Sequence, residues 1–148
     1  MKRLRRILHA TDFSAASRPA FKMAMDLAAR EGARLLLLHV LTPPSPLSAG
    51  SGPVPLSYLD LLQAARREAG RRLAAALARA RTAGIVAHTK LVEGGPTEQI
   101  LKIGRRWRPD LIVIGTHGRG GVRRFLLGSV AEHVVRRASR PVLTVRGR

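Results

Sequence analysis

The sequence predicts a single α/β domain over residues 1–148, with an open, five-stranded parallel sheet covered by helices on both faces. Three observations favour this class. Short apolar runs, typical of strands buried on both faces, alternate with longer segments of helical periodicity. The chain has 148 residues, the size of one typical domain. The alternation gives five strands and four helices, and such chains form parallel sheets with right-handed crossovers.

The first strand is expected over Leu4–Ala10, after a basic start. Ser17 is the expected N-cap of the first helix, because Pro19 is tolerated only in the first turn of a helix. That helix runs to about Arg30, where apolar residues cease to recur at helical spacing. The continuous apolar run Leu35–Val40 then forms a second buried strand.

A loop and a long helix follow the second strand. Thr42–Ser57 is rich in Pro, Ser and Gly, so it can be neither helix nor central strand. A loop of this length is usually mobile or functional, and whether it closes over a ligand stays open. The helix is expected over Tyr58–Ala83, with Arg66 beside its apolar stripe and therefore snorkelling toward solvent.

The second half of the chain repeats the alternation. A third strand is expected over Ile85–Val92, followed by a helix from Pro96 to Trp107. A fourth strand is expected over Leu111–Ile114, a helix from Ser129 onward, and a final strand over Pro141–Val145.

Glycines concentrate after the fourth expected strand. Gly115, Gly118, Gly120 and Gly121 fall within seven residues, and Gly128 precedes the start of the last helix. Glycines let backbone N–H groups approach phosphate oxygens, and a helix N-terminus adds partial positive charge. A strand, a glycine-rich loop and a helix start therefore predict an anion cradle whose natural ligand is a nucleotide.

Two common phosphate loops do not fit this stretch. The P-loop needs Lys before Ser or Thr, and Leu127 precedes Gly128-Ser129. The dinucleotide fingerprint begun at Gly118 would need glycine at Arg123. The spacing actually present, Gly115-x-x-Gly118 and then nine residues before Gly128-Ser129, resembles the ATP-binding signature G-2x-G-9x-G-[S/T] of the universal stress protein family. This resemblance covers essentially the whole chain.

The resemblance implies the strand order 3-2-1-4-5, which would set the end of the first strand against the glycine loop. In open α/β sheets, ligands bind at the carboxyl ends of strands where the strand order reverses. We therefore expect an adenine nucleotide, ATP or else ADP or AMP and with or without Mg²⁺, between strands one, two and four. The candidate contact residues are Ala10, Thr11, Asp12, Val40, Ile114, Gly115, His117, Gly118, Arg119, Gly128, Ser129 and Val130.

The expected roles differ among these residues. The glycines and Ser129 would hold phosphates, although a turn with Ser129 as helix cap is the structural alternative. Asp12 would accept a hydrogen bond from a ribose hydroxyl or help to hold a metal, rather than serving as a solvated turn residue. The resemblance implies that the backbone of Val40 contacts adenine. His117 and Arg119 either offset phosphate charge or point to solvent.

The acidic residues favour binding over catalysis. Phosphoryl transfer needs a positioned nucleophile, a base and usually Mg²⁺ held by carboxylates. Only Asp12 is well placed, whereas Glu93 and Asp110 lie near strand termini and Glu132 lies one turn into the last helix. We therefore predict no catalytic residue, and a stress-response protein in which nucleotide occupancy is the signal. A weak ATPase is an alternative.

The formal net charge of +18 raises nucleic acid as another partner. Against this, Lys and Arg are spread along the chain, and one Trp, one Tyr and three Phe leave few rings to stack on bases. We keep a polyanion-binding protein as an alternative that this pattern disfavours.

Composition also bears on location and metals. The chain has no Cys, which excludes disulfides, thiolate chemistry and Cys-based zinc sites. No two His have helical i, i+4 spacing, so no metal site is predicted. No apolar run approaches the roughly 20 residues of a membrane span, and the basic start leads into a strand rather than a signal-peptide core. We expect a cytoplasmic protein without a membrane partner.

The final strand, Pro141–Val145, would lie at a sheet edge, where unpaired backbone groups invite pairing with another chain. The family resemblance implies dimerisation through such a strand. We therefore expect a homodimer.

Overall fold

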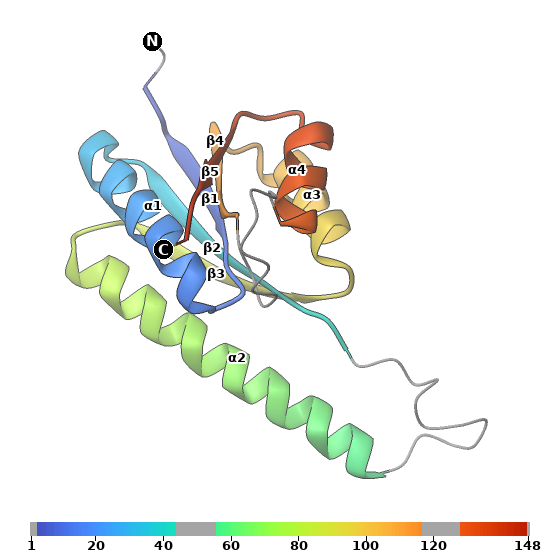
Figure 1. Ribbon diagram of the computed structural model, residues 1–148. Coiled ribbons are helices and arrows are strands. Elements are labelled where there is room, and N and C mark those ends of the chain that lie inside the picture. The colour runs from blue at the N-terminus through green and yellow to red at the C-terminus, as the bar shows by residue number, and fades with distance from the viewer. Residues whose placement is uncertain (1–2, 44–55, 117–127, 148) are drawn as a thin grey trace.

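The computed structural model describes residues 3–43, 56–116 and 128–147 (Figure 1). Strands and helices alternate along the chain. Their order is β1 (Arg6–Ala10), the short 3₁₀ helix η1 (Ala15–Ser17), α1 (Arg18–Glu31), β2 (Arg34–Leu41), α2 (Leu56–Thr82), β3 (Ala87–Glu93), α3 (Pro96–Trp107), β4 (Leu111–Gly115), α4 (Ser129–Arg137) and β5 (Val142–Val145).

The five strands form one parallel sheet in the order β3-β2-β1-β4-β5, which confirms the predicted fold class and strand order. β1 is central, and Ala10 at its end lies opposite Leu38 on one side and Ile114 on the other. The ends of β1, β2 and β4 therefore meet at the carboxyl end of the sheet.

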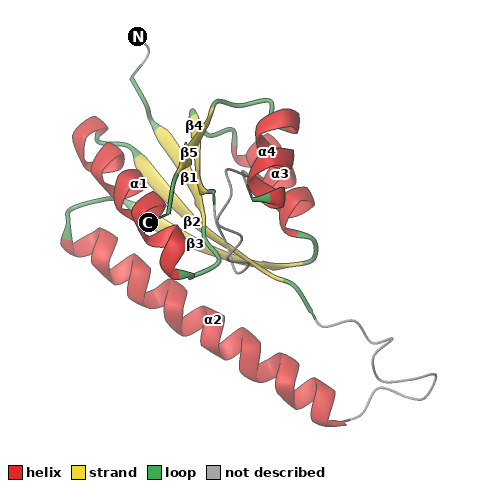
Figure 2. Cartoon of the chain, viewed as in Figure 1, coloured by secondary structure: helices red, strands yellow, loops and turns green. Residues whose placement is uncertain are grey.

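Helices cover both faces of the sheet (Figure 2). On one face, buried alanines of α1 and Leu73 of α2 pack against Ile7, Leu35 and Val113. On the other face, α3 and α4 pack against the alternate strand residues, including Leu8 and Ile112. Because successive strand residues point to opposite faces, continuous apolar runs are what this two-sided core requires.

The boundary between α2 and β3 differs from the prediction. Ile85 was expected to begin the third strand, but its N–H donates to the Ala80 carbonyl, and the N–H of Gly84 donates to Arg81. With Gly84 at a φ of +74°, these two bonds form a Schellman motif that ends α2. β3 begins only at Ala87, because the preceding backbone groups close the helix.

Two side chains in the helical regions make contacts that the sequence does not predict. Ser17 precedes α1 as predicted, but its side chain does not cap that helix and instead donates to the Ser14 carbonyl at 2.9 Å. The guanidinium of Arg66, expected to reach solvent, is exposed and is also paired with the carboxylate of Glu93. This pairing lowers the pKa of Glu93 and raises that of Arg66.

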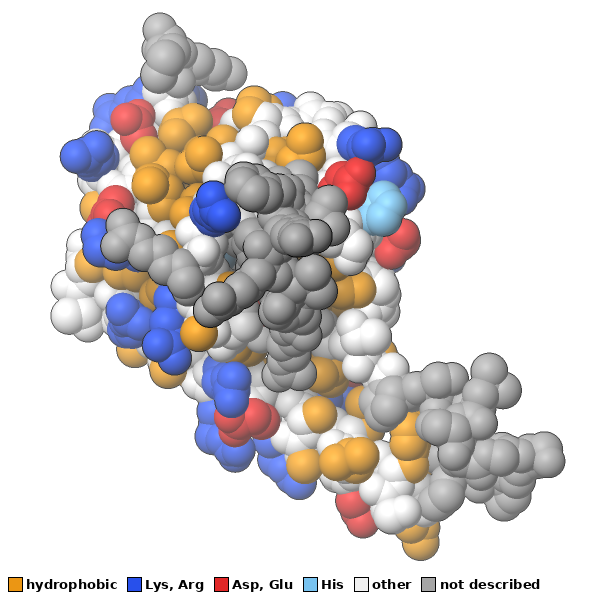
Figure 3. Space-filling view, in the orientation of Figure 1, with side chains coloured by type: hydrophobic (Ala, Val, Ile, Leu, Met, Phe, Trp, Pro, Cys, Tyr) orange, Lys and Arg blue, Asp and Glu red, His pale blue; other side chains and the backbone are white. Residues whose placement is uncertain are grey.

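The first turns of α2 project beyond the sheet (Figure 1). Leu56, Leu59 and Leu61 are exposed there, whereas Leu73 further along the helix is buried. Figure 3 shows hydrophobic side chains at the surface over these turns. The stripe is therefore covered only where α2 crosses the sheet. Among the described residues, none of the helices combines the length and apolarity that crossing a membrane requires.

Candidate functional site

The carboxyl ends of β1 and β4 form the topological switch point of the sheet. The two strands are neighbours, yet β1 leads into α1 on one face and β4 is followed by α4 on the other. Ligands of open α/β folds bind where adjacent crossovers diverge in this way. The polar residues that follow β1 and β4 therefore lie where such a fold binds its ligand.

The turn after β1 is held by side-chain to backbone hydrogen bonds. Oδ1 of Asp12 accepts from the N–H of Ser14 at 2.9 Å, and Oγ1 of Thr11 accepts from the N–H of Phe13 at 3.0 Å. The second oxygen of Asp12, Oδ2, has no hydrogen bond to a described residue. One oxygen of Asp12 thus shapes the turn, and the other is available to a ligand.

Phe13 adopts a strained backbone conformation at this turn. Its φ is +59°, in the left-handed region that an aromatic residue rarely occupies. The Phe13 ring lies 4.5 Å from the ring of His39, and the guanidinium of Arg72 lies 5.8 Å from its centroid. His39 Nδ1 in turn lies 2.8 Å from the Thr11 carbonyl, to which it donates. These contacts tie the turn to β2 and α2 and keep Asp12 in one conformation.

Gly115 lets the end of β4 approach this turn closely. A Cβ at Gly115 would lie 3.3 Å from the Cα of Ser17 and 3.4 Å from the carbonyl oxygen of Ala16. The segments after β1 and β4 are therefore packed together at backbone distance. A larger residue at Gly115 would push η1 away from the sheet.

The start of α4 returns to the end of β4. The N–H of Gly128 donates to the Thr116 carbonyl at 2.6 Å, and a Cβ at Gly128 would lie 2.7 Å from the same oxygen. Only glycine fits this approach without moving the backbone. The first helical bond runs from Glu132 to Gly128, so the N–H groups of Ser129, Val130 and Ala131 have no backbone acceptor among the described residues.

Ser129 occupies the first helical position of α4 and is exposed. Its hydroxyl makes no capping bond, since the N-cap position belongs to Gly128. Three N–H groups without a backbone acceptor in the described part of the chain, an exposed hydroxyl and the positive end of the helix dipole therefore lie together at the start of α4. This arrangement is suited to an anionic group.

A buried histidine lies directly before the site in β1. His9 is fully buried, its Nδ1 lies 3.1 Å from the Val113 carbonyl, and its ring centroid is 5.8 Å from that of Phe21. Burial lowers the pKa of His9 to about 4, and this outweighs the opposing effects of the Val113 hydrogen bond and the Asp12 charge. His9 is therefore neutral at physiological pH and belongs to the core.

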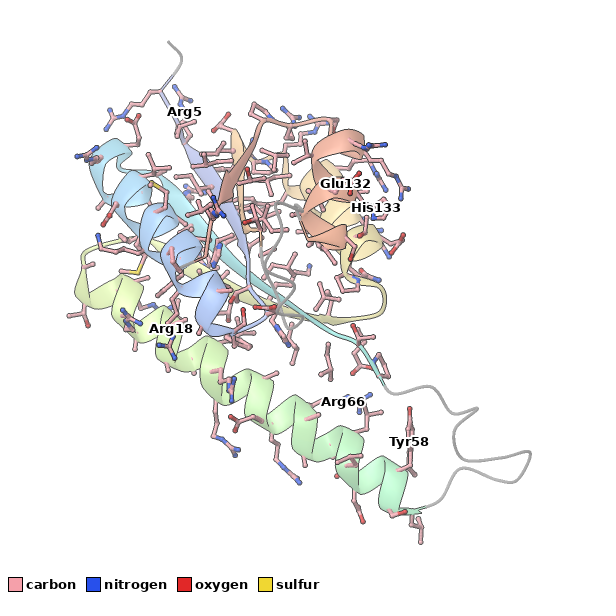
Figure 4. The ribbon with its side chains drawn as sticks, in the orientation of Figure 1. Arg5, Arg18, Tyr58, Arg66, Glu132 and His133 are labelled. Carbon is pink, nitrogen blue, oxygen red and sulfur yellow. The ribbon has the colours of Figure 1, made fainter. Side chains whose placement is uncertain are left out.

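Acidic residues around this end of the sheet are mostly paired. Glu132, in the first turn of α4, lies 3.0 Å from Arg136, and Glu93 at the end of β3 is paired with Arg66. Figure 4 shows Glu132 on α4 and Arg66 on α2, well apart from each other. The described part of the chain contains no cluster of three or more side chains able to hold a metal ion.

A comparison with known families bears directly on this arrangement. The model of the universal stress protein family matches residues 3–146. The universal stress protein MJ0531 of Methanocaldococcus jannaschii is 33% identical over 143 residues, which make up 96% of this chain and 82% of that protein.

The chain belongs to the universal stress protein family.

Solved structures agree with this assignment. The structure of MJ0577, another universal stress protein of M. jannaschii, matches with a TM-score of 0.85 and 27% identity over 99% of both chains. A universal stress protein in complex with cAMP matches with a TM-score of 0.70 and 26% identity, covering 99% of this chain and 100% of that one.

Most of the predicted contact residues of this universal stress protein lie at the carboxyl end of the sheet. They end β1, end β4 or begin α4, and comprise Ala10, Thr11, Asp12, Ile114, Gly115, Gly128, Ser129 and Val130. Val40 lies two residues beyond Leu38 on β2, half-buried and opposite Val92 of β3. His117, Gly118 and Arg119 lie outside the described residues, as does most of the Thr42–Ser57 loop.

Sequence reasoning missed two side chains that shape the site. His39 donates to the Thr11 carbonyl, and its ring lies 4.5 Å from that of Phe13 in a tilted arrangement. No sequence pattern predicts the role of Phe13, because a positive φ cannot be inferred from a single aromatic residue. The only clue was the position of His39 near the end of a strand next to β1.

Proposed function

We propose that this universal stress protein binds an adenine nucleotide at the carboxyl ends of β1, β2 and β4, and that occupancy of the site acts in the stress response as a signalling or protective state. The observation that carries the proposal is the start of α4. Three N–H groups that have no backbone acceptor among residues 3–43, 56–116 and 128–147 adjoin Gly128, as does the Ser129 hydroxyl. Gly128 itself contacts the Thr116 carbonyl just after β4. An anion such as a nucleotide phosphate satisfies those donors.

Each part of the nucleotide has candidate partners. Phosphates would be bound by backbone N–H groups of Gly115, Gly118 and Gly128 and by the Ser129 hydroxyl. His117 and Arg119 would offset phosphate charge. The remaining contacts would come from Ala10, Thr11, Ile114 and Val130 along the walls of the site and from the backbone of Val40 beside adenine.

Asp12 is the candidate for ribose recognition. One carboxylate oxygen is already used within the turn, and the other has no described partner. A hydroxyl such as a ribose 2′-OH or 3′-OH would donate a hydrogen bond to this second oxygen. The strained turn of Phe13 and its contact with His39 support this role, because they fix Asp12 before the ligand arrives.

The adenine class is supported by relatives. A universal stress protein 26% identical to this chain has been solved in complex with cAMP. We propose ATP as the ligand, with ADP and AMP as alternatives, because the glycine and Ser129 spacing resembles the ATP-binding signature of the family. ATP, ADP and AMP differ in their number of phosphates, and the N–H groups at the start of α4 are the groups that would distinguish them.

Magnesium would accompany a nucleotide with several phosphates. Mg²⁺ sites in nucleotide-binding proteins use one or two carboxylates together with phosphate oxygens. Asp12 is one such carboxylate, and most other ligands would come from the nucleotide and water. The protein's own contribution is therefore to position the phosphates.

Occupancy rather than turnover is the proposed signal. Glu132 is paired with Arg136, so it is a poor candidate for a base acting on water beside the phosphates. Asp12 is partly used in holding its turn. A hydrolysis rate comparable to those of ordinary ATPases, lost in Asp12→Asn, would contradict this part of the proposal.

The proposal is tested by calorimetric titration of ATP, ADP, AMP and cAMP into the wild type, Asp12→Asn and Asp26→Asn. Asparagine keeps an oxygen for the Ser14 N–H, so the turn is retained while the charge is lost. We expect binding to weaken about 10-fold or more in Asp12→Asn, since hydrogen bonds to charged groups are worth about 1.5–3 kcal/mol. Asp26, which is exposed and paired with Lys22, is the control and should bind as the wild type does. Equal affinities in all three proteins would contradict the proposal.

We also infer a homodimer formed through β5. This strand is an edge of the sheet, since its one neighbour is β4, and its residues are half-buried rather than buried. An edge of this kind can pair with a second copy of the strand. Sedimentation at micromolar concentration should give the mass of a dimer, and a monomer would contradict the inference.

A further inference from the structure

The amino end of the sheet, opposite the nucleotide site, concentrates arginine. In parallel α/β folds the helices run against the strands, so helix ends and strand starts meet at the same end. The arginines contributed there by β1, by the end of α3 and by the segments before β4 and β5 are Arg5, Arg6, Arg105, Arg106, Arg108 and Arg140, which we call the basic end. Figure 4 shows Arg5 at this end, away from Arg18 and Arg66.

The elements that carry these arginines are neighbours in the fold. The guanidinium of Arg6 lies 6.0 Å from the centroid of the Trp107 ring, which joins the start of β1 to the end of α3. Arg105 and Arg140 line the same small pocket, which joins α3 to the segment before β5. Residues up to 135 positions apart in sequence therefore form one surface, and this is why their clustering is invisible in the sequence.

The basic end has little negative charge of its own. Two carboxylates lie beside the start of β1. Oδ2 of Asp110 accepts from the backbone N–H groups of Arg5 and Arg6 at 2.9 and 3.0 Å, and Oε2 of Glu31 accepts from the N–H of Leu4 at 3.3 Å. Within the described part of the chain, none of the six arginines forms an ion pair. Arg5, Arg105, Arg106 and Arg108 are exposed, and Arg6 and Arg140 are half-buried.

Helix dipoles explain only part of this pattern. Arginines in the last turn of a helix stabilise its negative end, and this accounts for Arg105 and Arg106. Arg5, Arg6 and Arg140 belong to strand starts, where no helix end needs them. Arg136 and Arg137 of α4 are paired with Glu132 and Glu98 and are not counted here.

We propose that the basic end binds the phosphate backbone of nucleic acid without sequence specificity. All six cations are guanidinium groups, which bind phosphate oxygens in bidentate fashion and are favoured for nucleic-acid contacts. A membrane surface would also call for apolar side chains to insert. Four of the six exposed large apolar residues that the structure describes lie on α1 and the first turns of α2, and Val86 and Val135 are the two toward the amino end of the sheet. This surface is distinct from the nucleotide site.

The test compares two triple variants that each remove three positive charges. Arg5→Gln with Arg105→Gln and Arg140→Gln alters the basic end. Arg18→Gln with Arg67→Gln and Lys90→Gln alters exposed residues elsewhere and serves as the matched control. Binding of a labelled 20-base-pair DNA duplex of arbitrary sequence is followed by fluorescence anisotropy between about 50 and 300 mM salt, the range in which phosphate contacts are diagnostic.

The wild type should bind with micromolar affinity and a slope of log K against log salt of about −5, since each phosphate contact contributes about −0.9. In the basic-end variant the magnitude of this slope should fall by about 3, and the affinity for DNA should fall at least tenfold. The slope and affinity of the control should change little. A third variant with Lys at the same three positions should keep the slope. This variant also separates lost charge from damage to the fold.

Three results would overturn the proposal. Equal losses in the two glutamine variants would mean that overall charge, and not this surface, attracts DNA. Absence of saturable binding at about 150 mM salt would remove nucleic acid as a partner. Tighter binding to vesicles containing phosphatidylserine than to DNA, with the same loss in the basic-end variant, would assign the surface to membranes.

Discussion

The buried His9 makes the stability of the protein depend on pH in a defined window. Its ring is fully buried, Nδ1 donates to the Val113 carbonyl, and Nε2 has no hydrogen-bond partner in the structure. Protonation would put a second N–H and a positive charge where no described acceptor exists. Burial accordingly lowers the pKa of His9 from 6.5 to about 4 in the folded protein.

The size of the effect follows from linkage. Because the folded pKa lies below the unfolded one, the unfolded chain binds the proton first as pH falls. The contribution of neutral His9 to the free energy of unfolding is fully present above pH 6.5, and it is lost progressively as pH falls toward 4. At 1.36 kcal/mol for each pKa unit, the loss reaches about 2 kcal/mol at pH 5 and about 3 kcal/mol at pH 4.

Urea unfolding of the wild type, His9→Leu and His88→Gln at pH 7.5 and pH 5 measures this loss. Leucine has a similar volume and cannot be protonated, so the difference in unfolding free energy between the two pH values should shrink by about 2 kcal/mol in His9→Leu. His88 is exposed on β3, so His88→Gln serves as the control and should follow the wild type. The reasoning fails if His9→Leu retains the full pH dependence of the wild type.

Other predictions concern the site and the sheet edge. Ser129→Ala should weaken ATP binding about 3- to 10-fold in calorimetry, from one lost hydrogen bond, and leave the melting temperature unchanged because the hydroxyl caps nothing. Gly128→Ala should reduce both ATP affinity and, by about 1–3 kcal/mol, the free energy of unfolding in urea, because its Cβ would lie 2.7 Å from the Thr116 oxygen. Thr144→Lys, which adds charge to the edge strand β5, should shift sedimentation toward the monomer. A normal melting temperature with normal binding in Gly128→Ala, or a dimer of Thr144→Lys, would contradict these two predictions.

Much of the fold could be predicted because the core is two-sided. Strands buried on both faces read as continuous apolar runs, as Leu35–Val40 does, and this pattern persists whatever the strand order. The misplaced start of β3 has a local cause, because the N–H of Ile85 closes α2 and apolar character alone does not reveal that bond. The exposed first turns of α2 were not foreseen, since periodicity says nothing of where the sheet ends.

The site could be predicted only in part. The sequence predicts Gly115 and Gly128 as phosphate contacts, and that role stays a prediction. The structure shows a different requirement for glycine at both positions, the close approach to Ser17 and to the Thr116 carbonyl. The positive φ of Phe13 and the hydrogen bond from His39 to Thr11 depend on tertiary contacts that no local pattern encodes. The basic end escaped for the same reason, since its arginines are scattered along the chain and are gathered only by the parallel topology.

The central claim is that an adenine nucleotide binds at the switch point between β1 and β4. Amide chemical shifts of the ¹⁵N-labelled protein, recorded while ATP is added, test this claim most directly because they report the location as well as the fact of binding. We expect the largest changes at Thr11, Asp12, Gly115 and Ser129, with little change at Arg105. Changes confined to Arg105 and its neighbours, or no saturable change at all, would contradict the account.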